Sequence, residues 1–189
     1  MTDPTKALQQ GDALIVVDVQ RDFCPGGALP IENGDCVVPV LNAWLAAAEA
    51  RGVPIFASRD WHPPEHISFE TRGGPWPPHC VQDTEGAAFH PELRLPSSTI
   101  PVTKGTRFDQ DQNSAFAQTG LAQELLTRGV ERLWIGGLAE DVCVRATVLD
   151  ARAAGFDVHL INDATRPVSR AGGAAARAEM EAAGADVAP

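Results

Sequence analysis

The stretch Ala13-Leu-Ile-Val-Val17, with Asp18 directly after it, is a short apolar run that ends on an acid. Five consecutive apolar residues predict a strand that is buried on both faces, as the strands of a parallel sheet are. Four more strand-like runs follow along the chain, at residues 53–57, 100–103, 132–135 and 157–161. We therefore expect five buried strands, with residues 185–188 as a weaker candidate for a sixth.

Helix-forming segments separate these strands. They are rich in Ala, Leu, Glu and Arg, and they span residues 37–51, 121–128, 141–154 and 169–183. Glycines at 52, 129 and 155 follow three of them, and glycine is the residue that most often ends a helix. Alternating strands and helices predict a three-layer α/β/α fold, Rossmann-like, with a mainly parallel central sheet and right-handed connections.

Length and composition favour one domain, residues 1–189, with 44% apolar and 21% charged residues. The formal net charge is -10, and no cluster of Lys or Arg is present, so we expect neither nucleic acid nor an anionic membrane as a partner. The N-terminus lacks the layout of a signal peptide, and the four cysteines form no CxxC pair. We therefore expect free thiols and a cytoplasmic location.

The segment from residue 59 to residue 98 breaks the alternation of strands and helices. It contains many Pro and Gly residues and little periodicity. A connection of this length in a compact domain is usually functional. We expect it to contribute side chains to a site.

Four chemically active side chains lie at or just after the predicted strands: Asp18, Asp60, Lys104 and Cys143. Ligands of open α/β sheets bind at the carboxyl ends of the strands, so these side chains should converge on one crevice. Cys143 should lie in the first turn of a helix capped by Asp141, where the positive helix end favours a thiolate.

Each of these residues also has a structural interpretation. Cys143 alone could be a buried structural cysteine, Asp18 a turn cap, and Lys104 a solvated residue at the end of a strand. Together they supply a nucleophile, a proton acceptor and a cation that holds both in place. Covalent hydrolysis of an amide needs these three functions.

A second group of side chains is typical of a metal site. Asp60 and His62 are two residues apart, which in an extended segment places both on the same side, and His79 could complete a set of one carboxylate and two imidazoles. The alternative is that proline-flanked histidines only pack within a rigid loop. Cys80 could also compete as a ligand.

Several motifs together resemble one known family. They are Val16-Val-Asp-Val-Gln-Arg-Asp-Phe-Cys-Pro-Gly-Gly27, Arg59-Asp-Trp-His-Pro-Pro-Glu-His-Ile-Ser-Phe69, Trp76-Pro-Pro-His-Cys80, Lys104-Gly105 and Gly137-Leu-Ala-Glu-Asp-Val-Cys-Val144. In this combination and order, from about residue 13 to residue 163, the chain resembles the nicotinamidase/pyrazinamidase branch of the isochorismatase-like hydrolases.

The resemblance implies a catalytic triad and one divalent metal ion. The triad would be Asp18, Lys104 and Cys143, and the metal ligands Asp60, His62 and His79. Zinc is the metal that we expect first, with iron and manganese as alternatives. The role of His66 stays open: it either contacts the metal ligands without binding the metal itself or reaches the metal through a water molecule.

The same resemblance implies an oxyanion site and a ring site. It implies a cis peptide bond between Leu138 and Ala139, with the amides of Ala139 and Cys143 directed at the substrate oxygen. Phe23 and Trp76 match positions that flank the substrate ring.

The implied reaction is hydrolysis of nicotinamide to nicotinate and ammonia through a cysteine thioester. NAD salvage and degradation of environmental nicotinamide are both open as its role, and pyrazinamide is a candidate second substrate. Three alternatives stay open: an amidase of the N-carbamoylsarcosine type, which lacks the metal, an isochorismatase proper, and a non-catalytic metal-binding or partner-binding member of the fold. A homo-oligomer is also compatible with the sequence.

Overall fold

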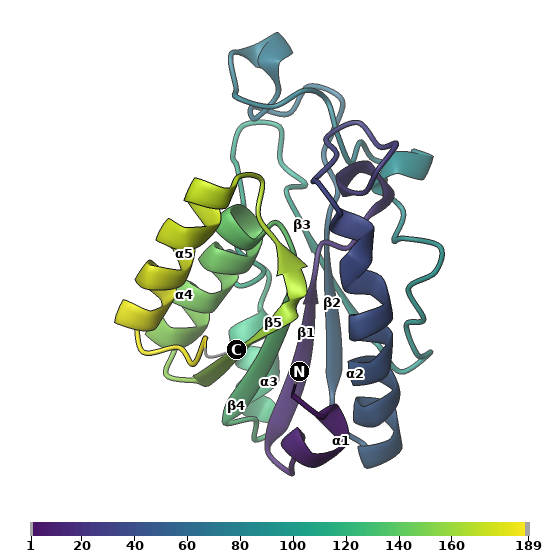
Figure 1. Ribbon diagram of the computed structural model, residues 1–189. Coiled ribbons are helices and arrows are strands. Elements are labelled where there is room, and N and C mark those ends of the chain that lie inside the picture. Colours follow the sequence, from purple (N-terminus) through teal and green to yellow (C-terminus); the bar gives the residue numbers. More distant parts are fainter. Residues whose placement is uncertain (1, 188–189) are drawn as a thin grey trace.

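The computed structural model describes residues 2–187, and its centre is a five-stranded sheet in the order β3-β2-β1-β4-β5 (Figure 1). Every neighbouring pair of these strands is parallel. The strands are β1 (Asp12–Val17), β2 (Ile55–Asp60), β3 (Ile100–Lys104), β4 (Arg132–Leu138) and β5 (Asp157–Arg166). The prediction of a mainly parallel sheet is therefore confirmed.

Helices cover both faces of this sheet, as predicted (Figure 1). They are α1 (Pro4–Ala7), α2 (Val37–Arg51), α3 (Leu121–Thr127), α4 (Arg145–Ala153) and α5 (Arg170–Ala182). Alternate residues of β1 serve the two faces, because successive side chains of a strand point in opposite directions. Leu14 and Val16 pack with α2, whereas Ile15 and Val17 pack with α3, α4 and α5. Burial of each such side chain contributes about 1.5–3 kcal/mol to stability.

Two predicted elements differ from the observed ones. The sixth strand is reduced to one parallel bridge between Asp186 and His159, and Ala188 lies outside the described residues. β5 runs on to Arg166, five residues beyond its predicted end. Its second half contains four polar residues, Asn162, Asp163, Thr165 and Arg166, which hide it from a search for apolar runs, but backbone pairing with β4 continues there.

The predicted helix over residues 141–154 is also divided. A π-helical turn, Glu140–Val144, precedes α4, and we refer to it as the Cys143 turn. The expectation that Asp141 caps this helix is wrong. Its carboxylate instead accepts hydrogen bonds from the amides of Val168 and Ser169, at the start of α5.

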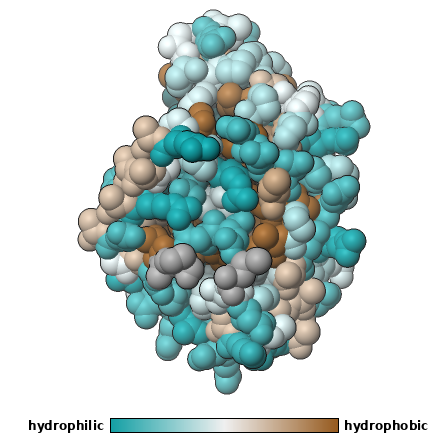
Figure 2. All heavy atoms as spheres, viewed as in Figure 1, coloured by the Kyte–Doolittle hydropathy of each residue, from teal (hydrophilic) through white to brown (hydrophobic). Residues whose placement is uncertain are grey.

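Within residues 2–187, no helix is long and apolar enough to cross a membrane. The face drawn in Figure 2 is covered largely by hydrophilic side chains, with hydrophobic ones scattered between them. All four cysteines are free, and only that at position 36 is exposed.

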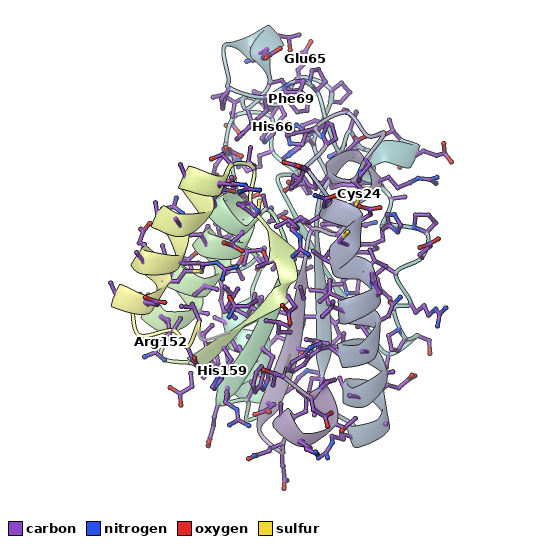
Figure 3. The ribbon with its side chains drawn as sticks, in the orientation of Figure 1. Cys24, Glu65, His66, Phe69, Arg152 and His159 are labelled. Carbon is purple, nitrogen blue, oxygen red and sulfur yellow. The ribbon has the colours of Figure 1, made fainter. Side chains whose placement is uncertain are left out.

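The order of the strands creates a crevice at one end of the sheet. From β1 the chain adds β2 and β3 on one side, and it then returns to place β4 on the other side of β1. In folds of this kind, ligands bind where the strand order reverses, outside the carboxyl ends of the strands. The segment between β2 and β3 lies over this end, and Figure 3 shows His66 and Phe69 within it.

Candidate active site

Lys104, the last residue of β3, is the centre of the site. Its Nζ lies 2.8 Å from Oδ2 of Asp18, 2.6 Å from Oδ1 of Asp60 and 3.5 Å from Sγ of Cys143. It also donates to the carbonyl oxygen of Gln112 at 3.2 Å. The side chain of Lys104 is fully buried, so this ammonium is held by protein groups instead of water.

Asp18 occupies the turn directly after β1. Its φ is 47°, a left-handed conformation that Asp tolerates better than most residues. The backbone N–H donates to the carbonyl oxygen of Ser58, and Ser58 Oγ donates to Oδ1 of Asp18 at 2.7 Å. Oδ2 is thereby directed to Lys104, and single ligand atoms of Asp18, Asp60 and Cys143 lie within 4.8 Å of one another.

Cys143 is buried at the base of the pocket. Burial raises the pKa of its thiol well above the ordinary value, and the nearby charge of Lys104 only partly opposes this. Desolvation of the sulfur thus outweighs the neighbouring positive charge, and the resting protein holds Cys143 as a thiol. The thiol needs a proton acceptor before it can react.

Asp18 is a suitable acceptor. Burial raises the pKa of its carboxyl, although the charge of Lys104 acts in the opposite direction. For Lys104, burial alone would lower the pKa, but the carboxylates of Asp18 and Asp60 outweigh it and keep the amine protonated. A carboxylate with a raised pKa binds a proton more readily than an ordinary one, which suits general-base chemistry.

The predicted metal ligands lie together next to this group. One ligand atom each of Asp60, His62 and His79 falls within 4.8 Å of the others, and all three residues are buried. Nδ1 of His62 contacts the carbonyl oxygen of Gly105 at 3.0 Å, and Nδ1 of His79 contacts that of Pro77 at 2.8 Å. Because a carbonyl accepts, Nδ1 carries the proton that faces it in both rings. Nε2 of His62 lies 3.6 Å from Oδ2 of Asp60. Burial alone would lower the pKa of this imidazole, but the Asp60 carboxylate outweighs it and raises the pKa.

This donor set fits a divalent metal ion. Two imidazoles and a carboxylate are ligands that zinc takes, and each ring is oriented by the hydrogen bond between its Nδ1 and a backbone carbonyl, as in known metal sites. Lys104 also lowers the pKa of Asp60, opposing the effect of burial, so this carboxylate is ionised and able to ligate.

His66 has a different environment from the three ligands. Its Nδ1 contacts Oγ of Ser68 at 2.7 Å, and its Nε2 contacts the carbonyl oxygen of Gln110 at 3.1 Å. Its ring stacks on that of His62, with centroids 4.0 Å apart. Both nitrogens are therefore used within the protein, and His66 packs against the ring of the predicted ligand His62. Cys80 is buried but does not belong to the cluster of Asp60, His62 and His79.

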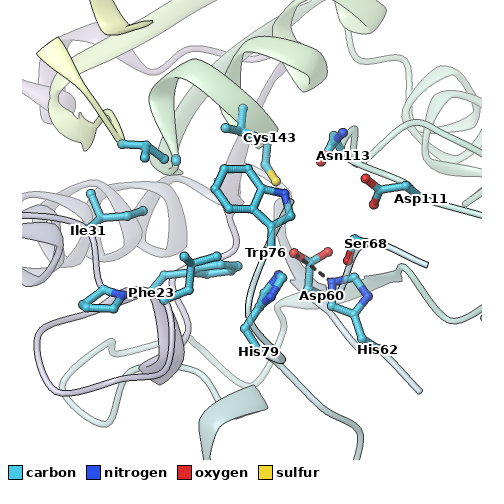
Figure 4. A pocket seen from close by; sticks show the side chains of 15 residues that line it. Phe23, Ile31, Asp60, His62, Ser68, Trp76, His79, Asp111, Asn113 and Cys143 are labelled. Carbon is cyan, nitrogen blue, oxygen red and sulfur yellow. Dashed lines mark ion pairs between the residues drawn. The ribbon is translucent and has the colours of Figure 1, made fainter. Parts of the chain in front are cut away.

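A pocket of about 520 Å³, counting its open mouth, is lined both by Cys143 and by the three predicted metal ligands Asp60, His62 and His79 (Figure 4). Figure 4 shows Cys143 and Trp76 around this pocket together with Asp60, His62 and His79. Phe23 and Trp76 both line the pocket, and its other lining residues include Leu29, Pro30, Ile31, Val142 and Val168. The walls are thus largely apolar, which suits a flat ring.

The peptide bond between Leu138 and Ala139 is cis. Ala139 lines the pocket and directly precedes the Cys143 turn. Within residues 2–187, the amide of Ala139 donates to no carbonyl or side chain. It is thus available to a substrate oxygen.

Two supporting residues escaped the sequence analysis. The amide of buried Gln20 donates to the carbonyl oxygens of Asp60 and Ala87 and accepts from the backbone N–H of Asp60. The side-chain amide of Gln112 accepts a hydrogen bond from the N–H of Gly105 and donates one to the carbonyl oxygen of Ala117. A glutamine in a polar segment gives no signal of burial, so only the contacts reveal these roles.

Comparison with known proteins agrees with this geometry. Residues 12–189 match the model of the family described as "Isochorismatase domain". The chain is 39% identical to the nicotinamidase of Escherichia coli strain K12, over 92% of each chain.

Two solved structures are also similar. The pyrazinamidase of Pyrococcus horikoshii in complex with zinc has a TM-score of 0.91 and 46% identity, over 94% of this chain and 98% of that one. PnC1 from L. infantum, in complex with nicotinate, has a TM-score of 0.87 and 38% identity, over 94% and 91% of the two chains.

Proposed function

This chain belongs to the isochorismatase domain family, and from that premise we propose that it hydrolyses nicotinamide to nicotinate and ammonia. The observation that carries the proposal is the position of Lys104. Its Nζ contacts Asp18 and lies 3.5 Å from the sulfur of Cys143, which lines the same pocket as Phe23 and Trp76. The relatives named nicotinamidase and the nicotinate complex support the substrate.

The pyridine ring enters between Phe23 and Trp76, with its carboxamide toward Cys143. An aromatic ring gains from stacking on aromatic side chains beyond the area that it buries. The ring nitrogen points to the side of the pocket that His62 and His79 line. This arrangement holds the carboxamide carbon within reach of the sulfur, which is the contribution of proximity to the rate.

Acylation begins when Asp18 accepts the proton of the Cys143 thiol and the sulfur attacks the carboxamide carbon. The amides of Ala139 and Cys143 donate to the oxyanion, and one such donor is typically worth about 3 kcal/mol. Asp18 then gives its proton to the nitrogen, the C–N bond breaks, and ammonia leaves. A thioester on Cys143 remains.

Water completes the reaction. Asp18 takes a proton from the water molecule, whose oxygen attacks the thioester, and the C–S bond breaks as the sulfur regains a proton. Nicotinate leaves with the protein unchanged. Throughout, the ammonium of Lys104 keeps the carboxylate of Asp18 oriented and compensates its charge.

Asp60, His62 and His79 would hold a divalent metal ion, and we propose zinc. When bound, the ion supplies a Lewis acid that orients the ring through its nitrogen, directly or through water. The hydrogen bonds from Nδ1 of His62 and His79 to backbone carbonyls support this assignment. So does the zinc in the pyrazinamidase of Pyrococcus horikoshii.

An amidase of the N-carbamoylsarcosine type is the second candidate, since it shares the acid, the amine and the thiol. The cluster of Asp60, His62 and His79 favours nicotinamide instead, because a metal-free amidase of an aliphatic substrate does not need it. Four free thiols support the proposal that the reaction takes place in the cytoplasm.

Ammonia release from nicotinamide tests the function directly. We expect the wild-type protein to release it, Cys143→Ala to lose it while retaining the native circular dichroism spectrum, and Cys36→Ala, at an exposed thiol, to keep it. Nicotinamide turnover by Cys143→Ala would refute the nucleophile. Release from N-carbamoylsarcosine alone would favour the second candidate, and release from neither compound would favour a non-catalytic protein.

A further inference from the structure

A partly buried ion pair joins the Cys143 turn to helix α5. Glu140 is 1% exposed, and its two carboxylate oxygens accept from Nε and Nη2 of Arg177, at 2.8 and 2.9 Å. The two residues are 37 positions apart. A two-point contact between a guanidinium and a carboxylate fixes the orientation of both groups as well as their distance.

The next residue of the turn contacts the same helix. Asp141 accepts from the amide of Val168 at 2.8 Å and from that of Ser169 at 3.2 Å. Ser169 is the N-cap of α5, and Val168 lines the pocket. Two consecutive acids thus attach the turn both to the start of α5 and to its second turn.

The sequence of α5 provides the space for this contact. A Cβ at Gly172 would lie 2.2 Å from Oδ2 of Asp141. A Cβ at Gly173 would lie 2.9 Å from Pro167 and 3.1 Å from Oε1 of Glu140. A larger residue at position 172 would therefore require the Asp141 carboxylate to move, and one at position 173 would require Pro167 or the Glu140 carboxylate to move.

We infer that Glu140 and Arg177 are positioning residues for the proposed hydrolysis, on which this inference rests. Glu140 is not among the residues that line the pocket, so it acts through the turn. It directly follows Ala139, whose amide is the proposed oxyanion donor, and it precedes the proposed nucleophile Cys143 by three residues. Holding Glu140 against α5 therefore fixes an oxyanion donor and the sulfur at once.

Steady-state kinetics of the zinc-loaded protein with nicotinamide test this role. The variants are Arg177→Met, which removes the donor, Arg177→Lys, which keeps its charge, and Glu140→Gln, which keeps the shape of the acceptor. Arg170→Met is the matched control, because Arg170 is an exposed residue of the same helix. A second measurement is the rate at which iodoacetamide alkylates Cys143 without substrate, followed by mass spectrometry of tryptic peptide 133–145.

In Arg177→Met we expect kcat to fall about tenfold to a hundredfold while KM changes less than about twofold, because the reacting groups are displaced but the ring site is intact. Alkylation of Cys143 should slow as the sulfur loses alignment with Asp18. The loss of kcat should be smaller in Glu140→Gln than in Arg177→Met. Arg177→Lys should have a higher kcat than Arg177→Met, and Arg170→Met should match the wild type. If Arg177→Met does not fold, the double variant Arg177→Met/Glu140→Gln takes its place, because it leaves no unpaired buried charge at position 140. The same fall in kcat is expected in it.

Three results would overturn the inference. One is a kcat within about twofold of the wild type in folded Arg177→Met or in the double variant. Another is an equal loss in Arg170→Met, and the third is an unchanged or faster alkylation of Cys143. If the wild-type protein released no ammonia from nicotinamide, the proposed function would fail, but the alkylation rates would still decide the role of Arg177.

Discussion

The carbonyl oxygen of Gly105 lies 3.0 Å from Nδ1 of His62. Gly105 directly follows Lys104 in the chain, so the same short segment carries the buried ammonium and orients the imidazole of the predicted metal ligand His62. Its φ is +65°, and a Cβ at this position would lie 2.4 Å from Cε1 of His62. The position of the Lys104 amine and the orientation of the His62 ring therefore both depend on the backbone at Gly105.

The first prediction concerns this turn. Gly105→Ala should displace the His62 ring and weaken zinc binding about tenfold to a hundredfold, as loss of an orienting partner does in other metal sites. The affinity for zinc is measured from the zinc content of the protein after dialysis against increasing concentrations of a chelator. Gly129→Ala is the control, because its φ is +68° but a Cβ there meets nothing within 4 Å. Equal zinc affinity in the two variants would contradict this dependence on Gly105.

Removal of the buried ammonium should destabilise the fold. Lys104→Met leaves the carboxylates of Asp18 and Asp60 buried and without their cation, at a cost of about 3–5 kcal/mol. Urea unfolding measures the change. Lys6→Met is the control, since Lys6 forms only an exposed ion pair and its loss should change stability by about 0–1 kcal/mol. Similar unfolding midpoints for both variants would show that Lys104 contributes little to stability.

A buried thiol makes stability depend on alkaline pH. Burial, with the charge of Asp35, raises the pKa of Cys24 to about 11. In the unfolded chain the thiol loses its proton near its ordinary pKa of 9.0, so the folded state binds more protons between pH 9 and pH 11. This contribution to stability is complete below pH 9 and is lost as the pH rises to 11.

Cys24→Ala should therefore lose less stability than the wild type between pH 9 and pH 11, as measured by urea unfolding at each pH. The pKa values of Cys80 and Cys143 are also raised, so part of the alkaline loss should remain in this variant. Cys36→Ala, which removes an exposed thiol, should show the same pH dependence as the wild type. Parallel curves for Cys24→Ala and the wild type would be incompatible with the raised pKa of Cys24.

The ring site predicts a change in KM. Trp76→Ala removes one wall of the pocket, and the loss of a stacked ring should raise KM for nicotinamide about tenfold, with a smaller effect on kcat. Trp76→Phe keeps an aromatic face and should stay within about threefold of the wild type. A fall in kcat without any rise in KM would mean that Trp76 does not contact the ring.

Much of the fold followed from local patterns. Apolar runs identified five strands, and helix-forming residues ending in glycine identified the helices between them, because backbone conformation and burial depend on near neighbours in the sequence. The residues at the strand ends, Asp18, Asp60 and Lys104, could be grouped for the same reason. Parallel strands all end at one edge of the sheet, whatever their order.

Contacts between distant residues could not be predicted in this way. The role assigned to Asp141 was wrong because Val168 and Ser169, 27 and 28 positions away, offer it better donors than its own helix. The burial that keeps the Cys143 thiol protonated was equally hidden, because desolvation depends on everything that surrounds the sulfur. Neither effect has a signature in the neighbouring residues.

The sequence by itself determined which elements form and which reactive side chains stand at their ends, since propensity and hydrophobic periodicity are local properties. Only the tertiary structure decided the strand order, the partners of His66, and the pairing of Glu140 with Arg177. These depend on which surfaces meet after the chain folds, and hydrogen bonds and charges change their energies once water is excluded.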